Sequence, residues 1–213
     1  MTPQLSVKDN IKLAEQSLPS LIYSCSLIEN IPVTKSQVST LLQGHSVSGM
    51  RVDDLQKVLN LIYAWRYMLN NIHTPLDLTF MKNINRYVAY NESIEWGVLR
   101  TGRVGITGTT FKPPIPQEEK VNDQIKKYRS TNDIEVAISY TLWFMKAQLF
   151  WDGNKRTGLI CLNKYLLSHG LGILSLSSKQ IYKFNKHLSF YYQTDSNHEI
   201  KDLLLNCISL TTV

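Results

Sequence analysis

The chain has 213 residues, of which 43% are hydrophobic and 19% are charged, with a formal net charge of +6. These are ordinary globular values for one domain with a real core, and no apolar run approaches the roughly 20 residues that span a bilayer. The positive charge suits anionic ligands such as nucleotides. No dense stripe of Lys and Arg with interleaved aromatics indicates a nucleic-acid partner.

The amino-terminal residues and the cysteines exclude further classes of protein. The first ten residues lack the apolar segment of a signal peptide, so we expect a cytoplasmic protein without a membrane partner. The three cysteines lie far apart in the sequence. Neither they nor the five histidines have the spacing of a zinc site or a disulfide framework.

Helical patterns dominate the first ninety residues. Residues 1–20 carry a weak amphipathic pattern, and Pro19 is typical of the first turn of a new helix. Glu29 ends that helix, where a carboxylate opposes the dipole and a partner elsewhere would relieve it; composition alone favours the alternative, a solvated surface position. Asp53 or Asp54 is suited to cap a long helix. We expect the helices of this part over residues 20–28, 34–42, 53–69 and 78–91.

Residues 97–116 have a different character. They are rich in glycine and β-branched residues and include a Pro pair, which predicts a short hairpin or extended flap. An exposed strand edge there would accept an extended peptide by β-augmentation, and a purely structural hairpin is the alternative. Further helices are expected over 121–128, 133–147, 157–168, 178–192 and 199–209, with a strand-like segment at 172–176. The predicted fold class is mainly α.

The stretch from Gln148 to Gly158 is the best candidate for a chemical site. A polar turn runs straight into an apolar helix, and the free N–H groups and positive dipole end of a helix N-terminus attract anions. Asp152 is a candidate ligand for a divalent cation, and Asn154 for a phosphate oxygen, with adjacent basic residues. The alternative is a plain turn and helix cap.

This stretch resembles the signature of the Fic family, HPFx(D/E)GN(G/K)RxxR. The matching residues are Phe150, Asp152, Gly153, Asn154, Lys155 and Arg156. Residues 97–114 resemble the family's flap hairpin, and Cys25 to Asn30 resemble its inhibitory-helix motif, (S/T)xxxE(G/N). The three pieces occur in the family's order and cover roughly residues 20–175.

The resemblance implies a Fic fold, which is a helical bundle with a small β-hairpin flap. It implies one domain over residues 1–213, with an N-terminal helical segment at 1–50 that carries the inhibitory-like helix. The Fic core would cover residues 51–175 with the flap at 97–116, and C-terminal helices would cover 176–213.

The resemblance also implies an activity, which is the transfer of AMP from ATP to a protein hydroxyl with Mg²⁺. Asp152 would hold the metal and Glu29 would inhibit. The nucleotide would be bound by Gly153, Asn154, Lys155, Arg156 and Thr157. The flap residues that would hold a target protein are Val104, Ile106, Thr107, Gly108, Thr109 and Thr110. The target, the preferred nucleotide and any homo-oligomer are left open.

Three departures from the family pattern qualify this activity. Gln148 occupies the position of the signature His, and a carboxamide has no usable basicity near neutral pH. Leu159 replaces the last Arg, which leaves Glu29 without its expected partner and is closer to Doc-type phosphotransferases. Cys25 replaces the Ser or Thr of the inhibitory motif.

The sequence therefore predicts a Fic-type nucleotide-binding protein whose transferase activity is weakened or altered. The alternatives are a non-catalytic nucleotide sensor, a protein-interaction module, a scaffold with a decayed site, or a Doc-like phosphotransferase.

Overall fold

The structure is a computed structural model that describes residues 5–129 and 132–213. Over these residues the chain forms nine helices and two short strands. In chain order they are α1 (Val7–Ile28), α2 (Lys35–Leu42), α3 (Val52–Asn70), α4 (Leu78–Val88), α5 (Glu118–Arg129), α6 (Ile134–Ala147), α7 (Asn154–Ser168), β1 (Ile173–Leu174), α8 (Ser178–Thr194), α9 (His198–Leu205) and β2 (Ile208–Ser209).

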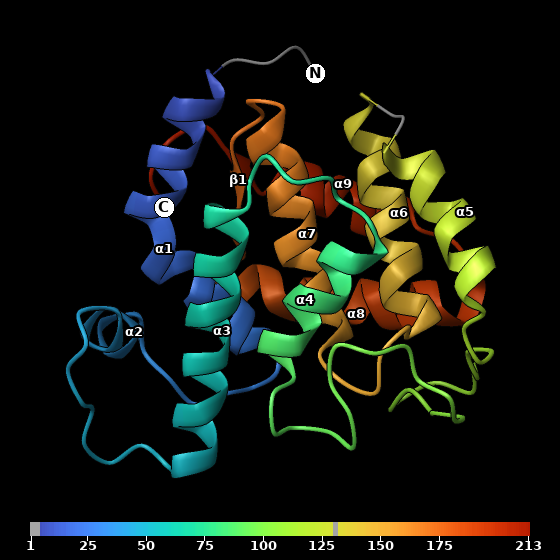
Figure 1. The fold of residues 1–213 in the computed structure, drawn as a ribbon, viewed down its shortest axis with the longest axis horizontal. Helices are drawn as coiled ribbons and strands as arrows, with labels where there is room; N and C mark the ends of the chain where they lie inside the picture. Colours follow the sequence, from blue (N-terminus) through green and yellow to red (C-terminus); the bar gives the residue numbers. More distant parts are fainter. Residues whose placement is uncertain (1–4, 130–131) are drawn as a thin grey trace.

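Helix α7 is the central element of the bundle. Every residue from Arg156 to Leu167 is buried, as expected of a helix with neighbours on all sides. Figure 1 shows it between α1, α3 and α4 on one side and α5 and α6 on the other, with α8 and α9 behind. Gly158 faces α6, where an added Cβ would lie 3.1 Å from Met145 Cε. The glycine therefore allows α6 and α7 to approach closely.

Most helix starts follow the capping chemistry of the sequence. Asp133 caps α6, and its side chain accepts a hydrogen bond from the Glu135 N–H. Thr34 and Ser177 form capping boxes at the starts of α2 and α8. For α3 the predicted cap was wrong by two or three residues, because Arg51 is the N-cap and the two aspartates lie in the first turn. There they still complement the helix dipole.

Two helices extend beyond their predicted starts. α1 is continuous through Pro19, contrary to the expected new helix. The carbonyl that Pro19 deprives of a donor belongs to Glu15, an exposed residue, so water can satisfy it while the buried residues on either side hold the helix. α7 begins at Asn154 rather than near Thr157, which places the signature's basic residues in its first turn. The first four residues of the predicted 1–20 pattern lie outside the described residues.

The small sheet lies away from the predicted flap. β1 confirms the strand-like segment, and it pairs antiparallel with β2, Ile173 opposite Ser209. The predicted last helix is therefore wrong after Leu205, where the chain turns to form β2. Residues 97–116 contain no strand, so of the two structures predicted there the hairpin is wrong and the extended segment is confirmed. The mainly α class is also confirmed. Among the described residues, no helix combines the length and apolar character needed to cross a membrane.

Candidate functional site

The candidate site is built around the short loop of residues 148–153 between α6 and α7. Both of its ends have left-handed backbone, with φ of 46° at Gln148 and 74° at Gly153. Between them Leu149 and Phe150 are 1% and 0% exposed, so two apolar side chains anchor the loop in the core. Phe150 packs against Phe144 of α6 with ring centroids 5.9 Å apart. The loop is therefore a fixed part of the core.

Asn154, predicted to bind phosphate, closes the loop with its side chain. Its Oδ1 accepts a hydrogen bond from the Phe150 N–H at 2.9 Å, and its Nδ2 donates to the Phe150 carbonyl oxygen at 2.8 Å. The same Nδ2 donates to Gln148 Oε1 at 3.1 Å. Both amide hydrogens are thereby engaged, so the side chain of Asn154 shapes the loop.

Gln148 is held inside the same set of contacts. Its Nε2 donates to the Met145 carbonyl oxygen at 2.6 Å, and its Oε1 accepts from Asn154. Both ends of the carboxamide are engaged by the protein. Tyr192 of α8 is buried and close to the Gln148 side chain, and its hydroxyl meets no geometric hydrogen-bond criterion with any described residue. Burial raises the pKa of Tyr192, and the charge of Glu29 raises it further, so the phenol stays protonated at neutral pH.

Asp152 lies just before the N-terminus of α7. Its side chain is 45% exposed and lies 3.6 Å from Arg156 Nη2, and its Oδ1 accepts from the Gly153 N–H. In the described part of the chain, the backbone N–H groups of Lys155 and Arg156 have no acceptor outside the helix. A partly exposed carboxylate beside free donors at the positive end of a helix dipole suits an anion accompanied by a cation.

A buried asparagine of α4 positions this end of α7. Asn85 Nδ2 donates to the Asp152 carbonyl oxygen at 2.8 Å and to Thr157 Oγ1 at 3.3 Å, and its Oδ1 accepts from the Gly97 N–H at 2.9 Å. Thr157, a predicted nucleotide contact, is fully buried and meets Asn85 instead. An added Cβ on Gly153 would lie 2.7 Å from Val88 Cγ1, so only glycine fits there.

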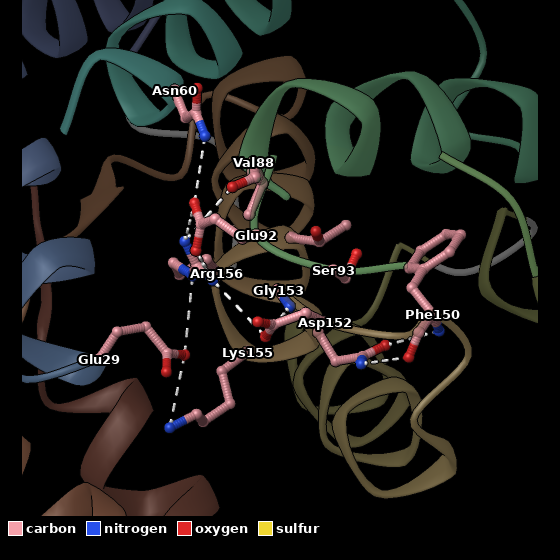
Figure 2. A network of polar contacts seen from close by, with 12 residues as sticks. Glu29, Asn60, Val88, Glu92, Ser93, Phe150, Asp152, Gly153, Lys155 and Arg156 are labelled. Atoms are coloured by element: carbon pink, nitrogen blue, oxygen red, sulfur yellow. Dashed lines mark hydrogen bonds and ion pairs between the residues drawn. The ribbon is translucent and has the colours of Figure 1, made fainter. Parts of the chain in front are cut away.

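Arg156, the remaining arginine of the signature, is 1% exposed and faces Glu92 (Figure 2). Its Nη1 donates to Glu92 Oε1 at 3.0 Å, and its Nη2 lies 2.9 Å from Oε2. Burial alone lowers the pKa of Arg156, but the hydrogen bond to Glu92 and the charges of Glu29, Glu92 and Asp152 raise it above its ordinary value. The arginine therefore stays charged.

Glu29 reaches the start of α7 from the end of α1. Its Oε1 lies 3.4 Å from Lys155 Nζ and 3.7 Å from Arg156 Nε. Glu29 lacks the expected partner at Leu159, as predicted, but two cations of the first turn take the place of the missing arginine. Leu159 itself is 2% exposed, in the core. The carboxylate at the end of α1 has the partner that its unfavourable position indicated.

The segment 97–116 runs beside the loop as extended chain with one turn. Figure 1 shows it next to the connection between α6 and α7. From residue 101 to 107 exposed and partly buried residues alternate, as in a pleated strand, and Val104 and Ile106 are on the inner side. The Thr109 N–H donates to the Ile106 carbonyl oxygen at 3.2 Å, which closes a turn at Thr107 and Gly108; Thr110 is exposed beyond it.

Arg100 joins this segment to the loop. It is 1% exposed, and its Nε donates to the Gln148 carbonyl oxygen at 2.5 Å. Its other donors reach the carbonyl oxygens of Gly102, Pro113, Pro114 and Ala147. The guanidinium thus caps the negative end of α6 and gathers both arms of the segment.

Glu92, Asn85 and Arg100 are functional neighbours that the sequence did not reveal. Each acts through contacts with segments many residues away, such as Asn85 with Asp152. Glu92 lies in a polar turn with no periodic pattern that would mark it as buried. Only a search for carboxylates able to neutralise a buried Arg156 would have singled it out.

Comparison with known proteins agrees with this geometry. Residues 75–166, which include the loop, match the model of the Fic/DOC family. No curated protein sequence matches the chain. A Fic-domain-containing signalling protein from Bacteroides thetaiotaomicron superposes with a TM-score of 0.77 at 17% identity, over 96% of this chain and 87% of that one.

Two further structures have the same fold. A Fic family protein from Desulfovibrio desulfuricans gives a TM-score of 0.74 at 18% identity, over 92% of this chain and 64% of that one. Fic-1 from C. elegans gives 0.72 at 16% identity, over 92% and 62%. The chain thus spans less than two thirds of these two proteins. At such identities the likeness establishes the Fic fold.

Proposed function

We propose that this Fic-fold protein binds a nucleotide at the start of α7, and that its transfer activity is weakened or altered relative to protein adenylyltransferases. The usual reaction moves AMP from ATP to a Ser, Thr or Tyr hydroxyl of a protein. That reaction needs a base for the hydroxyl proton, a metal for the phosphates and a surface for the target.

The observation that carries the proposal is that Gln148 is not basic and that both ends of its carboxamide are engaged by the protein. Its carboxamide accepts from Asn154 and donates to the Met145 carbonyl, and it has no basic nitrogen. General-base catalysis is typically worth about 10²- to 10⁴-fold in rate. A loose phosphoryl-type transition state needs little early deprotonation, so the loss slows transfer without abolishing it.

The binding half of the site is supported by Asp152 and the first turn of α7. The described residues contain no group of three or more His, Cys, Asp or Glu side chains that could hold a metal by themselves. Mg²⁺ is commonly bound through one or two carboxylates together with substrate phosphates, so Asp152 fits a metal that arrives with the nucleotide. Such an ion would neutralise phosphate charge, while the free N–H groups of Lys155 and Arg156 hold phosphate oxygens.

The extended segment 101–107 is the proposed surface for a target protein. Among the described residues, the backbone N–H groups of residues 101–107 donate no backbone hydrogen bond, which suits pairing with an extended peptide. Glu29 is the proposed inhibitory group, because it competes with any phosphate for Lys155 and Arg156.

A non-catalytic nucleotide sensor is the second candidate, and the engaged side chain of Arg156 favours it. An arginine held by Glu92 cannot follow charge that develops on a transferring phosphate. A Doc-like phosphotransferase rests on Leu159 alone and would also need a base.

Two measurements test the proposal. Calorimetry with millimolar Mg-ATP and related nucleotides should give binding that Asp152→Ala weakens. Absence of nucleotide binding, with Asp152→Ala indistinguishable from the wild type, would remove both the enzyme and the sensor. Incubation with labelled ATP then separates those two, since an enzyme labels itself or a lysate protein and a sensor does not. An equal nucleotide affinity for Glu29→Gly and wild type would contradict the inhibitory role of Glu29.

A further inference from the structure

The guanidinium of Arg156 has five N–H donors, and the protein engages three of them. Nη1 donates to Glu92 Oε1 at 3.0 Å and to the Val88 carbonyl oxygen at 3.3 Å, and Nη2 lies 2.9 Å from Glu92 Oε2. Nε is buried and meets no acceptor among the described residues. The two donors that remain, the Nε–H and the second Nη2–H, are neighbours on one edge of the planar group.

This Nε–Nη2 edge faces the side of the site that solvent can reach. Figure 2 shows Glu92 above the guanidinium, and Glu29 and Asp152 below it. Glu29 Oε1 lies 3.7 Å from Nε and Asp152 Oδ1 lies 3.6 Å from Nη2, both beyond hydrogen-bond range. Their side chains are 24% and 45% exposed, against 6% for Glu92. Two oxygens of one phosphate can bridge such an edge, which neither carboxylate does in the described structure.

Glu92 is fixed from behind by Asn60 of α3. Asn60 Nδ2 donates to Glu92 Oε1 at 3.1 Å and to the Tyr90 carbonyl oxygen at 2.8 Å. Asn60 is 2% exposed, and its Oδ1 accepts from Gln56 at 2.8 Å. Because the carboxylate is anchored in this way, its two-pronged contact sets the plane and the rotation of the Arg156 guanidinium.

Three carboxylates compete for this one guanidinium, since those of Glu29, Glu92 and Asp152 all lie within 4 Å of it. Without Glu92, the strongest contacts open to Arg156 would be direct pairs with Glu29 and Asp152. Such pairs would cover the edge that a phosphate needs and would engage the carboxylate proposed to hold the metal. The buried pair with Glu92 stabilises the other orientation, in which the edge stays free.

We propose that Glu92 is a positioning residue, which holds Arg156 so that its Nε–Nη2 edge is presented to a phosphate group of the nucleotide. The inference rests on the proposed nucleotide-binding function and assigns a phosphate contact of that site. The phosphate takes the place of Glu29 at this edge, so one anion is exchanged for another. A cation held by Asp152 would offset the charge of further phosphates, so the contact is compatible with ATP.

Calorimetric titration with Mg-ATP, and with Mg-tripolyphosphate as a probe without a base, tests the inference. Glu92→Gln places an amide N–H group against one terminal nitrogen of Arg156 and frees the guanidinium to turn toward Glu29 and Asp152. We expect the affinity for both probes to fall about tenfold, the order expected for a charge-assisted contact. Removal of a negative charge would by itself raise the affinity for an anion, so a fall opposes the effect of charge.

Glu118→Gln is the matched control for this variant. It removes an exposed carboxylate that pairs with Lys82, away from the loop, and it should keep the wild-type affinity for both probes. A double-mutant cycle then separates positioning from a structural role. In Arg156→Lys there is no planar fork to position, so adding Glu92→Gln should no longer lower the affinity for Mg-ATP. A structural role of Glu92 would lower the affinity in either background.

Side-chain NMR of the wild type gives a readout that needs no variant. The Nε–H resonance of Arg156, assigned through the carbons of its side chain, should shift when Mg-ATP is added, because a donor without a partner gains an acceptor. A resonance that does not move while calorimetry shows binding overturns the phosphate contact of Arg156 and leaves nucleotide binding intact.

The other outcomes separate the two proposals. If neither probe binds to the wild type, the proposed function itself is wrong. If the wild type binds Mg-ATP and folded Glu92→Gln binds it as tightly or more tightly, Glu92 does not position the arginine. Circular dichroism checks the folding of each variant. If Glu92→Gln does not fold, Glu92→Asp replaces it, because it keeps the charge but withdraws the carboxylate from Arg156, and an unchanged affinity in that variant likewise overturns the role of Glu92.

Discussion

Asn154 Nδ2 donates a hydrogen bond to Gln148 Oε1 at 3.1 Å, so the first residue of α7 holds the first residue of the loop. The contact joins Asn154, which closes the loop, to Gln148, which occupies the position of the signature His. In this chain the pair is an amide donor and an amide acceptor. The loop geometry is thereby kept without a base.

Restoring the base should restore transfer. In Gln148→His the new residue takes the left-handed backbone conformation of this position, with φ of 46°, which histidine tolerates better than most residues. Its neutral nitrogen can accept from Asn154 as Gln148 does. We expect labelled AMP transfer to rise by about 10²- to 10⁴-fold and to increase with pH through the imidazole pKa of about 6.5.

Gln148→Asn is the control for this experiment, since it changes the side chain without adding a basic group, and it should stay at the wild-type level. If Gln148→His remains inert even when combined with Glu29→Gly, the missing base is not the main defect. The fault would then lie with the flap segment or with Leu159.

The loop should be intolerant of a side chain at Gly153. This residue has φ of 74°, and an added Cβ would meet Val88 Cγ1 at 2.7 Å. We expect Gly153→Ala to lose about 2 kcal/mol of unfolding free energy, a fall of roughly 4–8 °C in Tm. Gly105→Ala is the matched control, because no atom lies within 4 Å of its added Cβ, and it should change stability by less than about 0.5 kcal/mol. Equal Tm values for the two variants would contradict the close packing of the loop on α4.

Asp133 and Glu92 show which contacts can be predicted from the sequence and which cannot. Asp133 caps α6 through a residue two positions away, and such local chemistry is visible in sequence. Glu92 is defined by Arg156 and Asn60, which lie 64 and 32 positions away, and only the packed fold brings them together. The signature loop was readable because its residues are consecutive.

The structure of the flap segment, residues 97–116, could be predicted only in part. Its glycines and β-branched residues predicted a short hairpin or an extended flap. The chain there is extended, and the carbonyl oxygens of Gly102 and Pro114 accept hydrogen bonds from Arg100 and not from a second strand. Contacts to a buried guanidinium from both arms of a segment leave no periodic trace in the sequence. The position of the flap was therefore predictable, and its hydrogen bonding was not.

Arg100 should contribute strongly to stability. It donates to five backbone carbonyl oxygens, and Arg100→Met would leave these acceptors without their donor in a buried place. We expect a loss of about 3 kcal/mol or more, measured by urea unfolding, and faster amide exchange across residues 98–114. Arg100→Lys should recover only part of this loss, because an ammonium has three donors and no planar fork. If Arg100→Met unfolds at the same urea concentration as the wild type, the predicted contribution of Arg100 to stability is wrong.

Lys164 should give the protein a distinct dependence of stability on pH. It is 2% exposed, and its Nζ donates to the Asn71 and Ile72 carbonyl oxygens at 2.8 and 2.6 Å, beyond the end of α3. Burial lowers the pKa of Lys164 from 10.5 to about 8, against smaller opposing effects of Cys161 and Asp77. Between these two pH values the unfolded chain binds more protons at this lysine than the folded chain does. The contribution of Lys164 to stability should therefore rise with pH across that window.

The measurement compares wild type with Lys164→Met by urea unfolding from pH 7.5 to 9.5. The buried cysteines act in the opposite direction, since burial raises the pKa of Cys25 to about 12 and that of Cys207 to about 11. Both proteins contain these two thiols, so their contribution cancels in the difference between the two unfolding free energies. Cys161 does not cancel, because the charge of Lys164 lowers its pKa; without that charge the pKa of Cys161 lies higher still, which moves the difference in the same direction. That difference should move in favour of the wild type as the pH rises. A difference that stays constant with pH would mean that Lys164 titrates alike in the folded and unfolded chain.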